Sequence, residues 1–153
     1  MKQETIFNSK TFIIWFLIFD FWYLDLDFSG HHLTTSSYEK NRIRGKINWF
    51  FHIIEISAKL KRTKPAIILE NKLLRAGTSC SLNYGEAVGA ESDKDFIHKI
   101  QIVLKELRET YIALRIIKKG NLSKDYVQLG KGINENNQLI GIFVKSIKTL
   151  KGL

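Results

Sequence analysis

Cysteine and proline are almost absent from this chain of 153 residues, which has one of each. A single cysteine, Cys80, excludes an internal disulfide framework and a zinc site built from several cysteines, and it fits a reducing cytoplasm. Because Cys80 lies among small residues at helical spacing, we expect a small buried group and not a nucleophile. The one proline, Pro65, indicates long uninterrupted helices.

Alternation of apolar and polar residues, which marks a strand, is also missing after residue 41. Apolar residues recur there at steps of three and four, which predicts four helices. The first ends near Lys59, the second begins at Pro65, the third runs from Ser92 to Gly120, and the fourth begins near Ser123. Four helices with short connections predict an all-α, antiparallel up-down four-helix bundle over residues 41–153. The residues expected on the four core faces are Ile47, Phe50, Phe51, Ile54, Ala58 and Leu60; Leu69, Leu73, Ala76 or Gly77, Cys80, Tyr84 and Ala87; Phe96, Ile100, Val103, Leu107, Tyr111, Leu114 and Ile117; and Tyr126, Leu129, Ile133, Ile140, Phe143, Ile147 and Leu150.

Small residues dominate one stretch of the second helix, RAGTSCSLNYGEAVGAES at 75–92, where eleven of eighteen are Ala, Gly, Ser, Thr or Cys. We interpret it as a tightly packed helix. Gly77, Gly85 and Gly89 each cost about 1 kcal/mol relative to alanine, which is tolerable where another helix approaches closely, in the bundle or from a second subunit. In the fourth helix, Asn136 or Asn137 is expected to face the core or a subunit interface.

The first forty residues have a different composition and hold ten of the chain's eighteen aromatic residues. The stretch 12–28 reads FIIWFLIFDFWYLDLDF, and its aspartates make membrane insertion costly. His31 and His32 have no third metal ligand at useful spacing. We interpret residues 1–40 as an extension outside the working fold, translated from a misplaced start. The alternative is a genuine membrane-proximal segment.

Motifs for enzymatic chemistry are weak. The run from Gly77 to Ser81 matches neither a nucleophile elbow nor a phosphate loop. A di-iron bundle needs a Glu-x-x-His motif on each of two helices, and Asp95-x-x-His98 is the only approximation. Glu86, Glu106 and Glu109 could add ligands, and His52 stands alone. We therefore expect no catalytic residue, no metal and no cofactor, with a metal-dependent bundle enzyme as a distant third hypothesis.

Positive charge is concentrated after residue 40. Residues 1–40 carry 3 basic and 5 acidic residues, whereas residues 41–153 carry 21 and 10. The up-down topology brings the first and third connections to one end of the bundle, and the second, with Glu91, Asp93, Lys94 and Asp95, to the other. The basic residues expected to gather at one end and bind nucleic acid are Lys59, Lys61, Arg62, Lys64, Lys118, Lys119 and Lys124.

Phosphate contacts of this kind supply affinity with little sequence preference, so we expect structured RNA or duplex to be read by shape and charge. Tyr84, Tyr111 and Tyr126 are expected to face the core, which leaves few rings for base stacking. An alternative is that the same charges dock an acidic partner protein. Another is that the lysines only complement helix dipoles and keep the protein soluble.

The segments RAGTS, NYGEA, AESDKDFIHK, KELRET and IFVKSIKTLKG resemble a family of small bacterial four-helix-bundle proteins, also called 23S rRNA-intervening-sequence proteins. The resemblance covers about residues 43–152. It implies a ring-shaped homopentamer around a central hole. It also implies similarity to the accessory protein of diversity-generating retroelements, which engages nucleic acid, so a reverse transcriptase joins RNA, DNA and an acidic protein among the expected partners.

Asn83 and Glu86 match the Asn-x-x-Glu positions of this family and share one helix face. One interpretation is a ligand-binding pair. The favoured interpretation is a structural polar pair that holds the second helix against a neighbour. Its expected partners are Arg75, Lys105 or Arg108.

Overall fold

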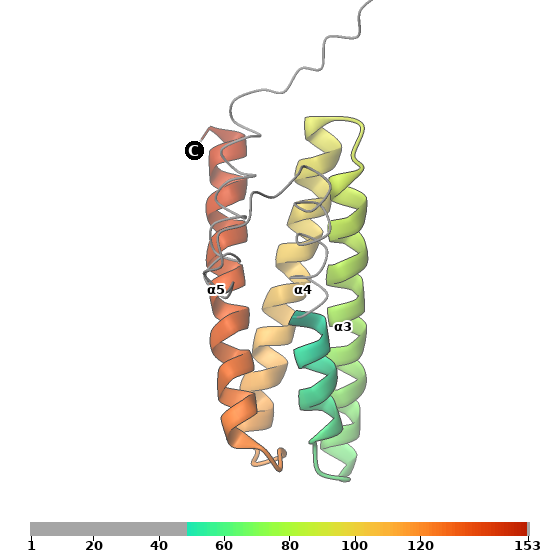
Figure 1. The fold of residues 1–153 in the computed structure, drawn as a ribbon, viewed down its shortest axis with the longest axis vertical. Coiled ribbons are helices and arrows are strands. Elements are labelled where there is room, and N and C mark those ends of the chain that lie inside the picture. Colours follow the sequence, from blue (N-terminus) through green and yellow to red (C-terminus); the bar gives the residue numbers. More distant parts are fainter. Residues whose placement is uncertain (1–48, 153) are drawn as a thin grey trace, which may run out of the picture.

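The computed structural model describes residues 49–152, which form four helical stretches (Figure 1). A helical segment at residues 49–58 is followed by α3 (Lys64–Val88), α4 (Asp93–Lys119) and α5 (Tyr126–Lys151). Within residues 49–152 there is no strand, only an isolated bridge between Leu60 and Ser123. The all-α prediction with four helices is therefore confirmed. The predictions for residues 1–40, for the domain boundary after residue 40 and for Ile47 lie outside the described residues.

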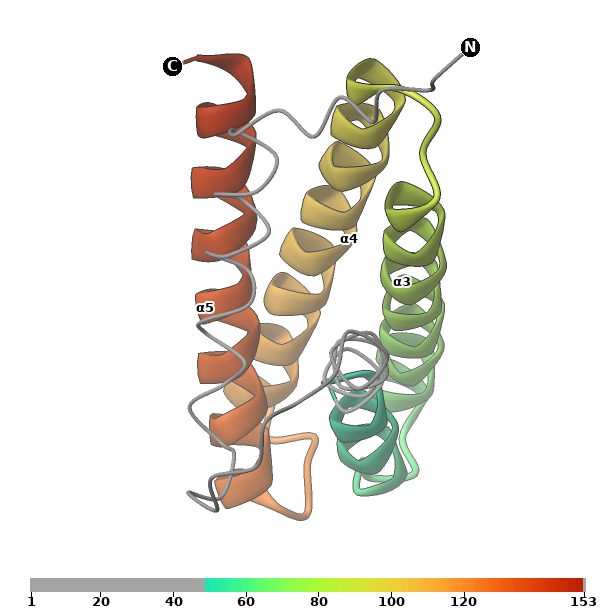
Figure 2. The ribbon, with the colours of Figure 1, turned by 45° about the horizontal axis from the view of Figure 1, so that its top comes forward.

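Packing between the helices is seen in a few specific contacts. Lys72 of α3 forms an ion pair with Glu109 of α4 at 2.7 Å, and Glu86 of α3 forms one with Lys99 of α4 at 2.6 Å. As the residue numbers rise along α3, the numbers of the partner residues in α4 fall. The helices α3 and α4 therefore run in opposite directions, and α5 returns along α4 (Figure 1). The segment 49–58 lies beside α3 (Figure 2), and its His52 bonds to Glu135 of α5.

The helix ends lie close to where the sequence predicts them. Pro65 lies in the first turn of α3, and the Ser92 hydroxyl caps α4 by accepting a hydrogen bond from the backbone N–H of Asp95 at 3.2 Å. Gly120 ends α4. The last helix begins three residues later than expected, because Asp125 is its N-cap and accepts a hydrogen bond from the N–H of Gln128 at 2.9 Å.

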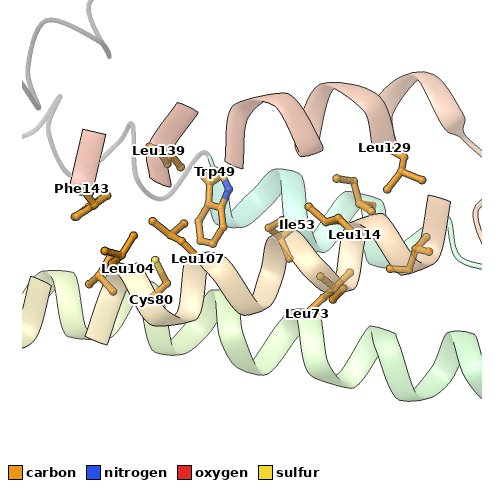
Figure 3. Close-up of a cluster of buried hydrophobic side chains, with 14 of the residues drawn as sticks. Trp49, Ile53, Leu73, Cys80, Leu104, Leu107, Leu114, Leu129, Leu139 and Phe143 are labelled. Carbon is orange, nitrogen blue, oxygen red and sulfur yellow. The ribbon is translucent and has the colours of Figure 1, made fainter. Parts of the chain in front are cut away.

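One continuous apolar core runs between the four helices, and Figure 3 shows part of it. Most of the faces predicted for α3 and α4 are buried, including Leu73, Cys80, Leu107 and Leu114. Cys80 is therefore a buried small side chain, as expected. The predicted residues that are half-buried are Leu69, Tyr84, Phe96 and Tyr111, and the first three pack against this core.

The predicted core face of the first helix is largely wrong. Phe51 and Ile54 are 54% and 37% exposed, and Ala58 is also exposed. As predicted, Leu60 is buried and Phe50 is half-buried against the core, whereas Trp49, Ile53 and Ile56 are core residues that the prediction missed. This helix has apolar residues on two opposite sides, and periodicity alone does not say which side faces inward.

The core face of α5 is predicted only in part: Leu129 and Phe143 are buried as expected, and the other predicted residues are not fully buried. Tyr126 is 42% exposed, so its expected core position is wrong, and its hydroxyl donates to the side chain of Asn121. The isoleucines Ile133, Ile140 and Ile147 are half-buried at the edge of the core. The centre of the face is taken by Leu129, Gly132, Asn136, Leu139, Phe143 and Ser146. Small and polar residues occupy the middle of this face, which an apolar pattern does not detect.

Asn136, not Asn137, is the buried asparagine of α5. It is fully buried, and its Nδ2 donates to the carbonyl oxygen of Leu107 in α4 at 2.9 Å. The prediction that one of the two faces the core is confirmed.

Among the three glycines of the small-residue stretch, only Gly77 makes a close packing contact. A Cβ there would lie 2.7 Å from Cδ2 of Phe50, so the missing side chain lets the first segment approach α3. Gly85 has no atom of residues 49–152 within 4 Å of its Cβ position, and Gly89 caps the C-terminus of α3. The expected close approach inside the bundle is therefore confirmed at Gly77 and wrong at the other two.

Candidate nucleic-acid interface

The two connections that carry the predicted basic residues are hydrogen-bonded to each other. The backbone N–H of Lys61 donates to the carbonyl of Leu122, and that of Lys124 donates to the carbonyl of Lys59, both at 2.8 Å. These bonds form the isolated bridge between Leu60 and Ser123. Both connections lie at the lower end of the bundle in Figure 1. The structure thus joins the two loops into one unit, which we call the basic end.

Seven basic residues belong to the basic end, and six of their side chains are exposed while Lys61 is half-buried. None of the seven forms an ion pair with a carboxylate of residues 49–152. Lys118 and Lys119 lie in the last turn of α4, where cations also complement the helix dipole. The seven residues are Lys59, Lys61, Arg62, Lys64, Lys118, Lys119 and Lys124.

The start of α3 adds a second source of positive potential at this end. Its N-cap, Thr63, makes no side-chain capping bond, and its first turn contains no acidic residue. Because Pro65 has no N–H and Ala66 is fully buried, Lys64 is the exposed residue of this first turn that keeps a backbone N–H, next to Arg62. A helix N-terminus of this kind favours anions, phosphate among them.

The connection between α3 and α4, at the opposite end of the bundle, is mostly acidic. There α4 begins with a Ser92 cap and with Asp93 and Asp95 in its first turn. Glu91 precedes them, and Lys94 is the neighbouring cation. The start of α3 is therefore uncapped and basic, whereas the start of α4, at the opposite end, is capped and acidic. The last turn of α5 brings Lys148 and Lys151 to that opposite end as well.

The predicted polar pair divides between two roles. The Asn83 Nδ2 donates to the carbonyl of Ser79, one turn earlier in the same helix, at 2.8 Å. Glu86 instead accepts a bond from Lys99 of α4, and this bond raises the pKa of Lys99. The expected partners Arg75, Lys105 and Arg108 are not the partners of Glu86, because the antiparallel register brings Lys99 to its level.

A second ion pair lies farther along the same two helices. The hydrogen bond from Lys72 lowers the pKa of the Glu109 carboxyl, and the nearby charges of Lys105 and Arg75 act in the same direction. Glu109 therefore stays ionised to lower pH than an isolated glutamate. Both pairs connect α3 to α4 at the surface of the bundle.

Metal ligands do not gather in the part of the chain that the structure describes. No group of three His, Cys, Asp or Glu side chains in residues 49–152 could hold a metal ion. His52 bonds instead to Glu135, with Nδ1 and Oε2 2.9 Å apart. None of the described helices is both long enough and apolar enough to span a membrane.

Sequence reasoning missed a second group of basic residues, on the outward side of α4. Lys105, Arg108, Arg115 and Lys119 are all exposed. They are spaced at three, seven and four residues, which places them on one helix face away from Val103, Leu107 and Leu114. This group could therefore have been predicted from the sequence.

The four packed helices, with two basic loops hydrogen-bonded to each other, place the chain in the class of small, basic helical-bundle proteins. A comparison with family models narrows this class. The model described as "23S rRNA-intervening sequence protein" matches residues 47–141, and the chain belongs to this family. No curated protein and no solved structure gives a significant match to the chain.

Proposed function

We propose that this protein is a non-enzymatic, cytoplasmic homo-oligomer of antiparallel up-down four-helix bundles that binds structured RNA or duplex nucleic acid through the basic end. The observation that carries the proposal is the hydrogen-bonded pair of loops, which holds seven basic residues together without carboxylate partners. The family's association with 23S rRNA genes is compatible with RNA as the ligand.

The physical chemistry of the basic end suits a phosphate backbone. Lysine and arginine side chains displace the counterions of a nucleic acid, and the start of α3 places the positive end of its helix dipole beside Arg62 and Lys64. The exposed ring of Tyr126 lies two residues after Lys124 and is available to stack on an unpaired base. Such a surface gives strong salt dependence and little sequence preference.

Self-association has its own support in the first helical segment. Phe51, Ile54 and Ala58 follow one another at steps of four or three and are exposed, while the opposite side of the same segment enters the core. A helix that is apolar on both sides is typical of a buried helix. We call these three residues the outer stripe and propose that a second copy covers it. In a ring of five copies, about 35 positive charges would line one rim.

Fluorescence anisotropy of the full-length chain with a labelled structured RNA and a labelled duplex DNA, over a salt series, tests the nucleic-acid proposal. We expect sub-micromolar binding near physiological salt and a steep loss of affinity as salt rises. Changing Lys61, Arg62, Lys118 and Lys119 to glutamate should weaken binding by at least about tenfold. A matched control changes four exposed lysines of α5 to glutamate, which alters the net charge equally: Lys131, Lys145, Lys148 and Lys151.

Equal losses in both quadruple variants would show that net charge, and not the basic end, governs binding. Absence of binding by the unmodified chain would overturn the nucleic-acid proposal altogether. An acidic protein would then become the leading partner of the basic end.

A further inference from the structure

The outward side of α4 combines cations with large exposed apolar side chains. Ile112 and Ile116 are 57% and 49% exposed. Helical spacing places the six residues of this surface on one side of α4, opposite the buried Val103, Leu107 and Leu114. They span about 21 Å at 1.5 Å per residue. We call this surface the α4 face, and its residues are Lys105, Arg108, Ile112, Arg115, Ile116 and Lys119.

The positive charge of the α4 face is almost unneutralised. Arg108, Arg115 and Lys119 form no ion pair with any of residues 49–152, and the Arg115 guanidinium lies 5.7 Å from the ring centre of Tyr111. Lys105 reaches Glu109 only at 4.0 Å, and that carboxylate is already bound by Lys72 at 2.7 Å.

The neighbouring helix extends the apolar part of this face. Lys72 of α3 and Glu109 of α4 meet side by side. Ile68, 68% exposed, lies one turn before Lys72, and Ile112 and Ile116 lie one and two turns after Glu109. Because α3 and α4 run in opposite directions, the three isoleucines lie in the same direction from the ion pair. Together they form an apolar strip bordered by the cations of α4.

The chemistry of this strip identifies the kind of ligand that fits it. A phosphate backbone would use the cations but gains nothing from three isoleucines. Two α4 faces brought together would oppose like charges. An amphipathic helix with carboxylates beside its apolar stripe would match both the charge and the apolar surface, and helix-in-groove recognition uses anchors at such spacing.

We propose that the α4 face is the docking surface for an acidic amphipathic helix of a partner protein. The apolar residues of that helix pack on Ile68, Ile112 and Ile116. Its carboxylates pair with Arg108, Arg115 and Lys119. This surface is distinct from the outer stripe and shares only Lys119 with the basic end, so the proposal goes beyond the proposed function.

Fluorescence anisotropy of the full-length chain with a designed, labelled 21-residue peptide tests this proposal. The peptide has leucine at the a and d positions of each heptad and glutamate at the e and g positions. One control peptide has the same composition in scrambled order, and another has lysine in place of glutamate. We expect the acidic amphipathic peptide to bind at least about tenfold more tightly than either control.

Two variants separate the apolar from the charged contribution. Ile112→Ser with Ile116→Ser, and separately Arg108→Glu with Arg115→Glu, should each weaken peptide binding by at least about fivefold. Val127→Ser, at an exposed apolar residue of α5, is the matched control and should leave it unchanged. Circular dichroism confirms that each variant keeps its helices.

The serine variant also distinguishes this proposal from the nucleic-acid proposal, because it should bind the labelled RNA as the unmodified chain does. Unweakened peptide binding by the serine variant would overturn the docking proposal, as would equal binding of the scrambled peptide. Absence of peptide binding at about 100 µM would overturn it as well. Loss of RNA binding in the serine variant would reassign the α4 face to nucleic acid.

Discussion

Gly77 of α3 and Gly132 of α5 lie where these helices contact the segment 49–58. The Cβ position of Gly77 is 2.7 Å from a ring carbon of Phe50, and that of Gly132 lies against Cδ1 of Ile56. Carbon atoms normally pack at about 3.5–4.0 Å, so neither position has room for a methyl group without movement of the neighbour. The segment 49–58 therefore approaches α3 and α5 where side chains are missing.

Gly77→Ala is expected to lower the free energy of unfolding by about 1–3 kcal/mol, because the half-buried Phe50 ring must move to admit the methyl group. Gly85→Ala in the same helix is the matched control. It should raise that free energy by up to about 1 kcal/mol, since alanine favours the helix and nothing lies within 4 Å. Urea unfolding of the full-length chain, followed by circular dichroism, measures both changes. Stabilisation by both substitutions would show that the Phe50 ring moves without cost.

Single residues at helix boundaries were predictable, whereas those that pack between helices were not. Pro65, Ser92 and Gly120 act within one turn of their own positions, so local sequence was enough to assign them. Gly77 and Gly85 look alike in sequence. Only the position of Phe50, in another helix, separates a packed glycine from an exposed one.

Two of the helices show the limit of periodicity as a guide to packing. The segment 49–58 has apolar residues on two opposite sides, and the side that includes Trp49 and Ile53 enters the core. In α5 the core contains Gly132 and Ser146, which carry no apolar signal. By contrast, α4 has one dominant apolar face, and most of that face was predicted correctly.

Asn136 is the polar group that fixes how α5 meets α4. Its Nδ2 donates to Leu107, but its Oδ1 is buried without a hydrogen-bond partner among the described residues. An unsatisfied buried oxygen of this kind destabilises the folded state. We therefore regard Asn136 as a residue that specifies register at the expense of stability.

Asn136→Leu is expected to raise the free energy of unfolding by about 1 kcal/mol, because it removes the unpaired oxygen and fills the same space with apolar atoms. Thermal and urea unfolding of the full-length chain measure the change. Asn137→Leu, at the exposed neighbouring residue, is the control and should change stability by less than about 0.5 kcal/mol. A clear loss of stability in Asn136→Leu would mean that the bond to Leu107 outweighs the unpaired oxygen.

Among the described residues, the meeting of the two basic loops was predictable from the order of the elements, without knowledge of any side-chain contact. Successive helices that reverse direction bring alternate connections to the same end, and the bridge between Leu60 and Ser123 shows that the two basic loops meet. The α4 face was not found in this way, because it depends on which side of α4 remains uncovered by its neighbours.

The outer stripe leads to a prediction about the assembled molecule. Phe51→Ser with Ile54→Ser should shift the full-length chain from an assembly of about 89 kDa, five times the 17.8 kDa monomer, towards the monomer. Size-exclusion chromatography with light scattering measures the mass. Circular dichroism should be unchanged, because both side chains point away from the core.

Leu82→Ser is the control for this assembly, since Leu82 is equally apolar and exposed but lies on α3. It should leave the mass unaltered. An unchanged mass in the double variant would exclude the outer stripe as the contact between copies.

The bridge between the two loops also bears on the thermodynamics of any ligand that the basic end binds. Loops that become ordered on binding lose conformational entropy, which weakens association. Here backbone hydrogen bonds from Lys61 and Lys124 already hold both loops before a ligand arrives. The backbone positions that carry these lysines are therefore already fixed relative to one another. The entropy of binding would then be governed by the release of ions from the ligand and not by the folding of the site.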